Sequence, residues 1–148
     1  MSLLDNRKAF FSYELVEKLE AGIELFGFEV KALRKGMGSL AGSYVIIRGG
    51  EAFLVGATIS PYQVGNTPKE YESKRSRKLL LAKAEIARLE GATARSGLTV
   101  VPIAVYNKGR YIKVELALAR GKKKADKRQT IKKRETDREM RRTLKTGK

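Results

Sequence analysis

The chain contains no cysteine and no histidine, and only three of its 148 residues are aspartate. Without cysteine there is no disulfide framework, no thiolate nucleophile and no sulfur-based zinc site. Without histidine there is no Ser-His or Cys-His pair and no imidazole metal ligand. Two of the aspartates, Asp126 and Asp137, lie near the C-terminus, so no pocket of converging acids for magnesium is indicated. The sequence therefore predicts a non-enzyme with no catalytic residues, no metal and no cofactor.

Long apolar runs are also absent. No window approaches the roughly 18 apolar residues that a membrane-spanning helix requires. The first residues, MSLLDNRKAFFSYEL, contain no apolar run long enough for a signal peptide. We therefore expect a soluble, cytoplasmic protein, and a length of 148 residues suits one compact domain with an appendage.

Positive charge is abundant and unevenly distributed. The chain has 32 basic and 16 acidic residues, and residues 121–148 hold 13 of the basic and 4 of the acidic ones. The sizeable apolar side chains of this segment are only Ile131, Met140 and Leu144, so it has too little apolar surface to build a core. We therefore predict a domain over residues 1–120 and a basic tail over 121–148 that is disordered when free. A polyanion is the expected partner, with nucleic acid the first candidate and an anionic membrane the second.

The tail permits a helix once it is bound. Residues 130–146 contain neither glycine nor proline, and acidic and basic residues recur there at i,i+3 and i,i+4 spacing. A helix would place Arg134, Arg138, Arg142 and Lys145 in one basic stripe. Alone, the segment buries too little apolar area to offset the entropy of ordering, whereas phosphate neutralisation changes that balance. The simpler alternative is a nonspecific solubilising tail.

The body reads mostly as antiparallel β-structure. Two β-rich runs flank Gly49-Gly50 within residues 43–60, and two more flank residues 107–110 within 98–120, so two hairpins are predicted. Residues 13–27 read as a strand with a bend or bulge at Gly22. Pro102 predicts an edge or a bulge in its strand.

Two helices and a long loop are predicted between these strands. Residues 28–36 form a short helix that ends at Gly36, and residues 77–97 form the strongest helix, with an apolar face that includes Leu80. Residues 60–77 read as a surface loop. A small closed antiparallel barrel of five or six strands, of the OB type and with peripheral helices, is the simplest architecture because closure removes exposed strand edges.

Several stretches together resemble one family. These are NRKA, EAGIELFGFEVKALRKG, SYVIIRGGEAFLVGATISPY, RKLLLAKAEIARL, GLTVVPIAVY, KVELALARGKK and DKRQTIKKR, which occur in the family's order over nearly the whole chain. On these motifs the chain is similar to the SmpB, or SsrA-binding protein, family of bacteria. The resemblance implies an OB-like barrel that binds the tRNA-like domain of transfer-messenger RNA (tmRNA). It further implies a monomer that reaches stalled ribosomes with elongation factor Tu, its tail occupying the vacant mRNA path near the decoding centre.

The resemblance also assigns residues to sites. The RNA-binding surface would comprise Asn6, Arg7, Lys8, Glu20, Leu80 and Lys113. The tail positions tied to ribosome binding would be Lys122, Lys123, Asp126, Lys127, Arg128, Lys132 and Arg134. From the residues alone, Leu80 could equally be core of its helix, and Lys113 a solvated side chain on the polar face of a strand. Glu20 has the wrong charge for RNA, unless it accepts hydrogen bonds from bases or 2′-hydroxyls or orients a basic neighbour.

Two other interpretations remain open on composition. A structural ribosomal protein also combines a small barrel with a basic extension. An OB-type single-strand binder would be expected to interleave more exposed aromatic residues with its basic ones.

Overall fold

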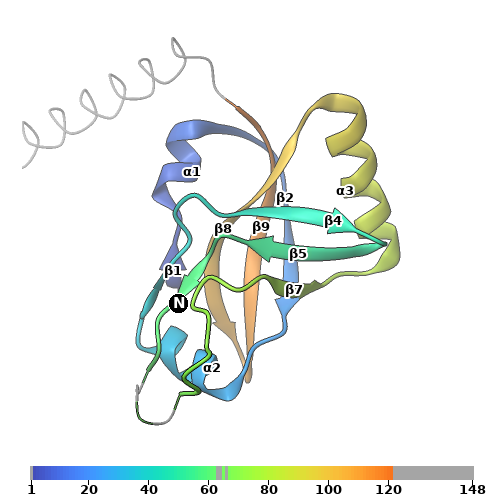
Figure 1. The fold of residues 1–148 in the computed structure, drawn as a ribbon. Coiled ribbons are helices and arrows are strands. Elements are labelled where there is room, and N and C mark those ends of the chain that lie inside the picture. Colours follow the sequence, from blue (N-terminus) through green and yellow to red (C-terminus); the bar gives the residue numbers. More distant parts are fainter. Residues whose placement is uncertain (1, 63–64, 66, 122–148) are drawn as a thin grey trace, which may run out of the picture.

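The computed structural model describes residues 2–62, 65 and 67–121, and these fold around a ring of β-strands (Figure 1). The elements follow the order β1 (Ser2–Asp5), α1 (Arg7–Ser12), β2 (Tyr13–Ile23), α2 (Gly27–Arg34), β3 (Gly38–Ser39), β4 (Tyr44–Arg48), β5 (Glu51–Val55), β6 (Thr58–Ile59), β7 (Arg77–Leu80), α3 (Lys83–Ser96), β8 (Thr99–Lys108) and β9 (Tyr111–Gly121). Gly121, which the sequence assigns to the tail, is therefore the last residue of a strand. The rest of the predicted tail, with all seven of its candidate ribosome-binding residues, lies outside the described residues.

Six strands close into an antiparallel barrel. Their order around the ring is β8-β4-β5-β7-β2-β9, and β9 returns to pair with β8. Strand β1 lies outside the ring and pairs with β8, while β3 and β6 form a separate small sheet. Closure leaves no free edge in the ring. The prediction of a small antiparallel barrel with peripheral helices is confirmed.

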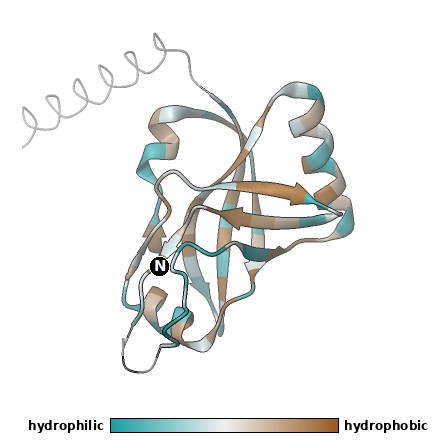
Figure 2. Cartoon of the chain, viewed as in Figure 1, coloured by the Kyte–Doolittle hydropathy of each residue, from teal (hydrophilic) through white to brown (hydrophobic). Residues whose placement is uncertain are grey.

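Alternation along β9 separates the inside of the barrel from the outside. Val114 and Leu116 are fully buried in the core, whereas Lys113 and Glu115, which alternate with them, point outward and are partly exposed. Hydrophobic residues colour much of β4 and β5 in Figure 2, in agreement with their share of the same core. The outward face of β9 continues into the neighbouring strands and forms the surface considered below.

Both predicted hairpins are present. Gly49 and Gly50 have φ values of 60° and 75°, the positive pair that a tight type I′ turn between β4 and β5 requires. Gly109, with φ of 62°, occupies the turn between β8 and β9. The register of β8 against β9 is irregular between Pro102 and Ala104, which confirms the expected bulge at this proline.

The short helix is also confirmed as α2. It ends at Arg34, and Gly36 follows with φ of +70°, the left-handed conformation that commonly terminates a helix. At its other end, the Glu29 side chain accepts a hydrogen bond of 2.9 Å from the backbone N–H of Phe26.

Within the described residues, no helix has both the length and the apolar content to cross a membrane.

The predicted helix over residues 77–97 is wrong in its first turn. Residues 77–80 form strand β7, and the helix α3 begins only at Lys83. The three successive leucines fit both periodicities, but pairing of β7 with β5 and β2 satisfies the backbone and places Leu79 in the core at 1% exposure. Gly91 lies inside α3, and Gly97, with φ of 62°, ends it.

The bend or bulge predicted at Gly22 is wrong. Gly22 pairs in regular register with Leu80 on one side and Lys113 on the other, and the irregularity in β2 falls between Leu15 and Glu17. A side-chain Cβ added at Gly22 would lie 3.2 Å from the Cβ of Leu80. A larger residue at position 22 would therefore press on the Leu80 side chain of β7. Strand β1 and helix α1 were not predicted, because they are too short to show the repeat of apolar residues that identifies a strand or a helix.

A buried ion pair fixes α2 and the loop before β7 against the barrel. Glu29 on α2 and Arg77 on β7 are both fully buried, and Arg77 Nη2 lies 2.8 Å from Glu29 Oε2. Arg77 also donates to the carbonyl oxygens of Ala57 and Ser73 at 3.0 and 2.9 Å. The guanidinium of Arg75 contacts the same carboxylate. Three segments distant in sequence are thus joined by one charge cluster.

The cluster controls the protonation of Glu29. Burial alone would raise its pKa, but hydrogen bonds from Arg75, the Phe26 backbone and Arg77 together hold the pKa below the usual value of 4.5. A carboxyl with a lowered pKa in the folded state stabilises the fold at neutral pH. That contribution is lost as the pH falls from 4.5 through the folded-state pKa.

Replacing Glu29 by glutamine leaves the buried Arg77 without its carboxylate. We expect the free energy of unfolding, measured by urea denaturation, to fall by roughly 3–5 kcal/mol. The difference from wild type should narrow as the pH falls below 4.5. The control is Glu51→Gln, which breaks an exposed 3.2 Å pair with Lys78 and should cost about 1 kcal/mol or less. Equal losses in the two variants would contradict this account.

Candidate nucleic-acid interface

Three of the predicted RNA-binding residues meet on one outer face of the barrel. Gly22 on β2 lies opposite Leu80 on β7 and opposite Lys113 on β9. Glu20 precedes Gly22 by two positions and therefore points to the same side of the sheet. We call Glu20, Leu80 and Lys113, with the hairpin between β8 and β9 beside them, the outer patch.

Leu80 is a surface residue and not part of the core. It is the last residue of β7 and is 50% exposed, whereas its neighbour Leu79 is buried. The alternative that Leu80 is core of a helix is therefore wrong. An exposed leucine that is separated from a lysine only by a glycine on the strand between them is suited to contact a ligand.

Glu20 is engaged by neighbours within the protein. Its carboxylate accepts a short hydrogen bond from the hydroxyl of Tyr106 and another, of 3.1 Å, from Lys108 Nζ. These bonds lower the pKa of Glu20, the bond from Tyr106 contributing most and that from Lys108 next. Desolvation, followed by donation to Glu20, raises the pKa of Tyr106 well above its usual value. Glu20 thus orients a tyrosine and a lysine and is not an isolated charge on this face.

Sequence reasoning predicted the hairpin between β8 and β9 but did not assign its residues to the site. The exposed residues Lys108, Arg110 and Tyr111 surround its turn, and Tyr111 is 70% exposed. Lys113 Nζ lies 5.8 Å from the centroid of the Tyr111 ring, within cation–π range. The signal was present in the sequence YNKGRY, where two tyrosines flank two basic residues at a predicted turn.

The three predicted RNA-binding residues near the N-terminus differ in their exposure. Asn6 is buried, and its side-chain amide donates a 2.8 Å hydrogen bond to the carbonyl oxygen of Pro102, so it anchors the start of α1 at the bulge of β8. Arg7 and Lys8 are exposed on α1. Of these three residues, only Arg7 and Lys8 have side chains that a ligand could reach.

Helix α1 nevertheless shares the barrel face of the outer patch. Ala9 packs against Ala119, which lies on the same outward-pointing side of β9 as Lys113. Six positions along β9 separate Ala119 from Lys113, or about 20 Å at roughly 3.3 Å per residue. Arg7 and Lys8 thus form a second cationic region on one continuous face.

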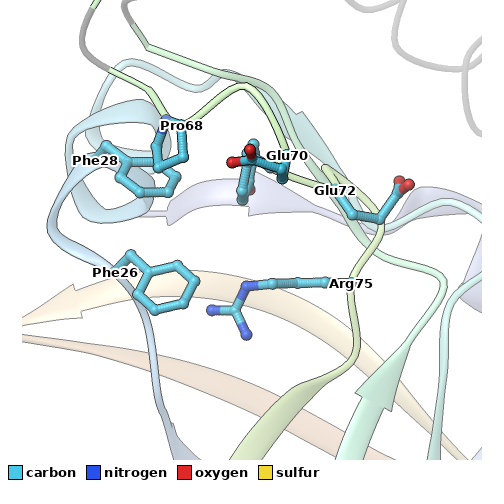
Figure 3. A pocket seen from close by; sticks show the side chains of 7 residues that line it. Phe26, Phe28, Pro68, Glu70, Glu72 and Arg75 are labelled. Carbon is cyan, nitrogen blue, oxygen red and sulfur yellow. The ribbon is translucent and has the colours of Figure 1, made fainter.

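A separate aromatic pocket lies between α2 and the loop before β7 (Figure 3). It measures about 400 Å³ and is lined by Phe26 and Phe28, whose ring centroids are 5.5 Å apart. The guanidinium of Arg75 lies 4.2 Å from the Phe26 ring, and Figure 3 shows it beside that ring. Glu70 and Glu72 also line this pocket, so its rim repels phosphate.

In the part of the chain that the structure describes, no cluster of three acidic side chains is placed to hold a metal ion.

Comparison with known proteins identifies the family. The sequence model described as "SmpB protein" matches residues 3–146. The chain belongs to the SmpB family. The SsrA-binding protein of Trichodesmium erythraeum is 48% identical, with 95% of this chain and 90% of that protein covered. The SsrA-binding protein of Burkholderia vietnamiensis is 46% identical, with 99% of both chains covered.

A solved structure agrees with this assignment. It is described by the words "tmRNA-SmpB: a journey to the center of the bacterial ribosome" and superposes with a TM-score of 0.68 at 45% sequence identity. The match covers 82% of this chain and 85% of that SmpB-family chain. The barrel described above is therefore similar to one that has been solved.

Removing the Tyr106 hydroxyl should raise the pKa of Glu20. In Tyr106→Phe the carboxylate loses the hydrogen bond that lowers its pKa most, so its titration, followed by NMR of the side-chain carboxyl, should move toward the usual value of 4.5. Tyr44→Phe, at a 43% exposed tyrosine on β4, is the control and should leave the Glu20 pKa unchanged. An unchanged pKa in Tyr106→Phe would show that Lys108 alone holds the carboxylate.

Proposed function

We propose that this protein is an RNA-binding adaptor of trans-translation. Its barrel binds the tRNA-like domain of tmRNA, and its basic tail then occupies the vacant mRNA path of a stalled ribosome near the decoding centre. The observation that carries this proposal is the match to the SmpB family over residues 3–146. Relatives named SsrA-binding protein and the solved tmRNA–SmpB structure support it.

The barrel supplies the tmRNA contacts. In this proposal Leu80 and Lys113 touch the RNA, and Glu20 holds Lys108 and Tyr106 for it. Arg7 and Lys8 add phosphate contacts on the same face, and Asn6 fixes the helix that carries them. Phosphate contacts of this kind position an RNA, while apolar and aromatic contacts to unpaired bases add selectivity.

The tail supplies the ribosome contact. Its candidate residues are Lys122, Lys123, Asp126, Lys127, Arg128, Lys132 and Arg134. With 13 basic residues between positions 121 and 148, it suits a channel lined by phosphates. We propose that it becomes helical on the ribosome, because phosphate neutralisation there offsets the entropy of ordering.

The remaining parts of the proposal concern partners and place. The protein acts as a monomer in the cytoplasm, reaches the ribosome with aminoacylated tmRNA and elongation factor Tu, and performs no chemistry of its own. The alternative of a structural ribosomal protein predicts its presence on every purified ribosome. The adaptor predicts enrichment on stalled ribosomes only.

Lys113→Gln should weaken tmRNA binding by removing one phosphate contact. We expect the slope of log affinity against log salt concentration, measured by filter binding, to become shallower by roughly 0.7–0.9. Lys35→Gln, at an exposed position next to α2, is the matched control and should keep the wild-type slope. An unchanged slope in Lys113→Gln would remove this lysine from the interface.

Reversal of three tail charges should separate binding from rescue. The variant Lys127→Glu, Arg128→Glu, Lys132→Glu should bind tmRNA within a few-fold of wild type by gel shift and yet abolish tagging of stalled products. A chain that ends at Gly121 should behave likewise. The control reverses Lys31, Lys35 and Lys69, which are exposed on the body and carry the same total charge. Wild-type tagging by the tail variant, or loss of tmRNA binding, would refute the division of labour.

A further inference from the structure

A small hollow lies within the outer patch, at the end of β2. It measures about 210 Å³, and its lining includes Ile23, Leu25, Leu80, Arg110, Tyr111 and Lys113. Pockets for drug-sized molecules occupy about 300–1,000 Å³. The hollow therefore suits a group of about one ring system, and its walls combine apolar side chains with cations.

Tyr111 gives the hollow a free aromatic surface. Its side chain is 70% exposed, the highest value among the exposed large hydrophobic residues of the described chain. Leu80, on the opposite strand of the lining, is 50% exposed. Exposed apolar surface of this kind gains free energy when a ligand covers it. The face of a tyrosine ring is suited to stack on a flat aromatic group.

The charges around the hollow favour an anionic ligand. Arg110 and Lys113 line it, and none of its described lining residues is acidic. Glu20, a carboxylate on the same face, is already bound by Lys108 and Tyr106. The aromatic pocket at Phe26 differs, because Glu70 and Glu72 line it. Of the two sites, only the hollow combines an exposed ring and cations with a described lining that holds no acidic residue.

Gly22 keeps the hollow in shape. The backbone of Gly22 lies against Leu80, so that an added Cβ would meet Leu80 Cβ at 3.2 Å and Cδ1 at 3.3 Å. Both residues are held in paired strands, so the backbone cannot easily yield. Any larger residue at position 22 must displace the Leu80 side chain and change the wall of the hollow.

We propose that this hollow binds a single unstacked base of an RNA. The base lies against the Tyr111 ring and Leu80, while Arg110 and Lys113 contact the phosphates on either side of it. Base stacking on an aromatic side chain combined with basic flanks is a common way to hold unpaired RNA. This inference rests on the proposed function, since tmRNA supplies the base, and it adds a residue, Tyr111, that selects for an unpaired nucleotide.

The test compares full-length variants for binding to tmRNA at several salt concentrations. Tyr111→Ala should weaken binding roughly 5- to 150-fold, the loss typical of one stacked base. The salt slope should stay unchanged because no charge is lost. Tyr111→Phe keeps the ring and should bind within about twofold of wild type. Phe26→Ala, at a 51% exposed aromatic residue outside the hollow, is the control and should bind like wild type.

Chemical probing of tmRNA then identifies the base. One unpaired nucleotide should be protected by wild type and by Tyr111→Phe but reactive in complexes with Tyr111→Ala and Gly22→Ala. Circular dichroism of each variant controls for folding. If wild type binds tmRNA and Tyr111→Ala binds equally well, the base-binding site is refuted and the proposed function stands. If wild type fails to bind tmRNA, the proposed function fails first, and the inference falls with it.

Discussion

The fully buried contact between Glu29 and Arg77 determines how the rest of the molecule is arranged. It joins α2 to β7 across the interior, and β7 is the strand that connects β5 to β2 in the ring. A buried cation without its carboxylate would be strongly destabilising, so the two elements can adopt only the arrangement in which they meet. Because β7 ends at Leu80, this ion pair also positions the apolar part of the outer patch.

The outer patch shows how a basic protein places carboxylates on a cationic surface. Glu20 does not face solvent as an isolated charge, since Tyr106 and Lys108 bond to it and lower its pKa. Glu115, in the same row, lies 3.7 Å from Lys18. Each acid on this face therefore has a cation or hydroxyl beside it. Arg110, at the turn of the β8–β9 hairpin, remains exposed.

The positive charge of the chain is divided between the barrel and the C-terminal segment. The barrel holds its basic residues on rigid strands, where their spacing can match one folded RNA. The tail concentrates 9 of the 16 net positive charges where there is too little apolar area for a core. Rigid spacing favours recognition of one shape, and a strongly basic sequence with little apolar surface favours a polyanionic partner.

Sequence by itself determined the elements whose signal is local. The two hairpins follow from glycine-rich turns between alternating strands, and α2 follows from its periodicity and Gly36. Absence of histidine and cysteine removed whole classes of chemistry before any fold was known. Only the tertiary structure decided that residues 77–80 form a strand, because Leu79 and Leu80 fit a helix and a strand equally until β5 and β2 pair with them. Tertiary contacts likewise decided the roles of Gly22, Asn6 and Glu20, whose partners Leu80, Pro102 and Tyr106 are distant in sequence and meet them only when the ring closes.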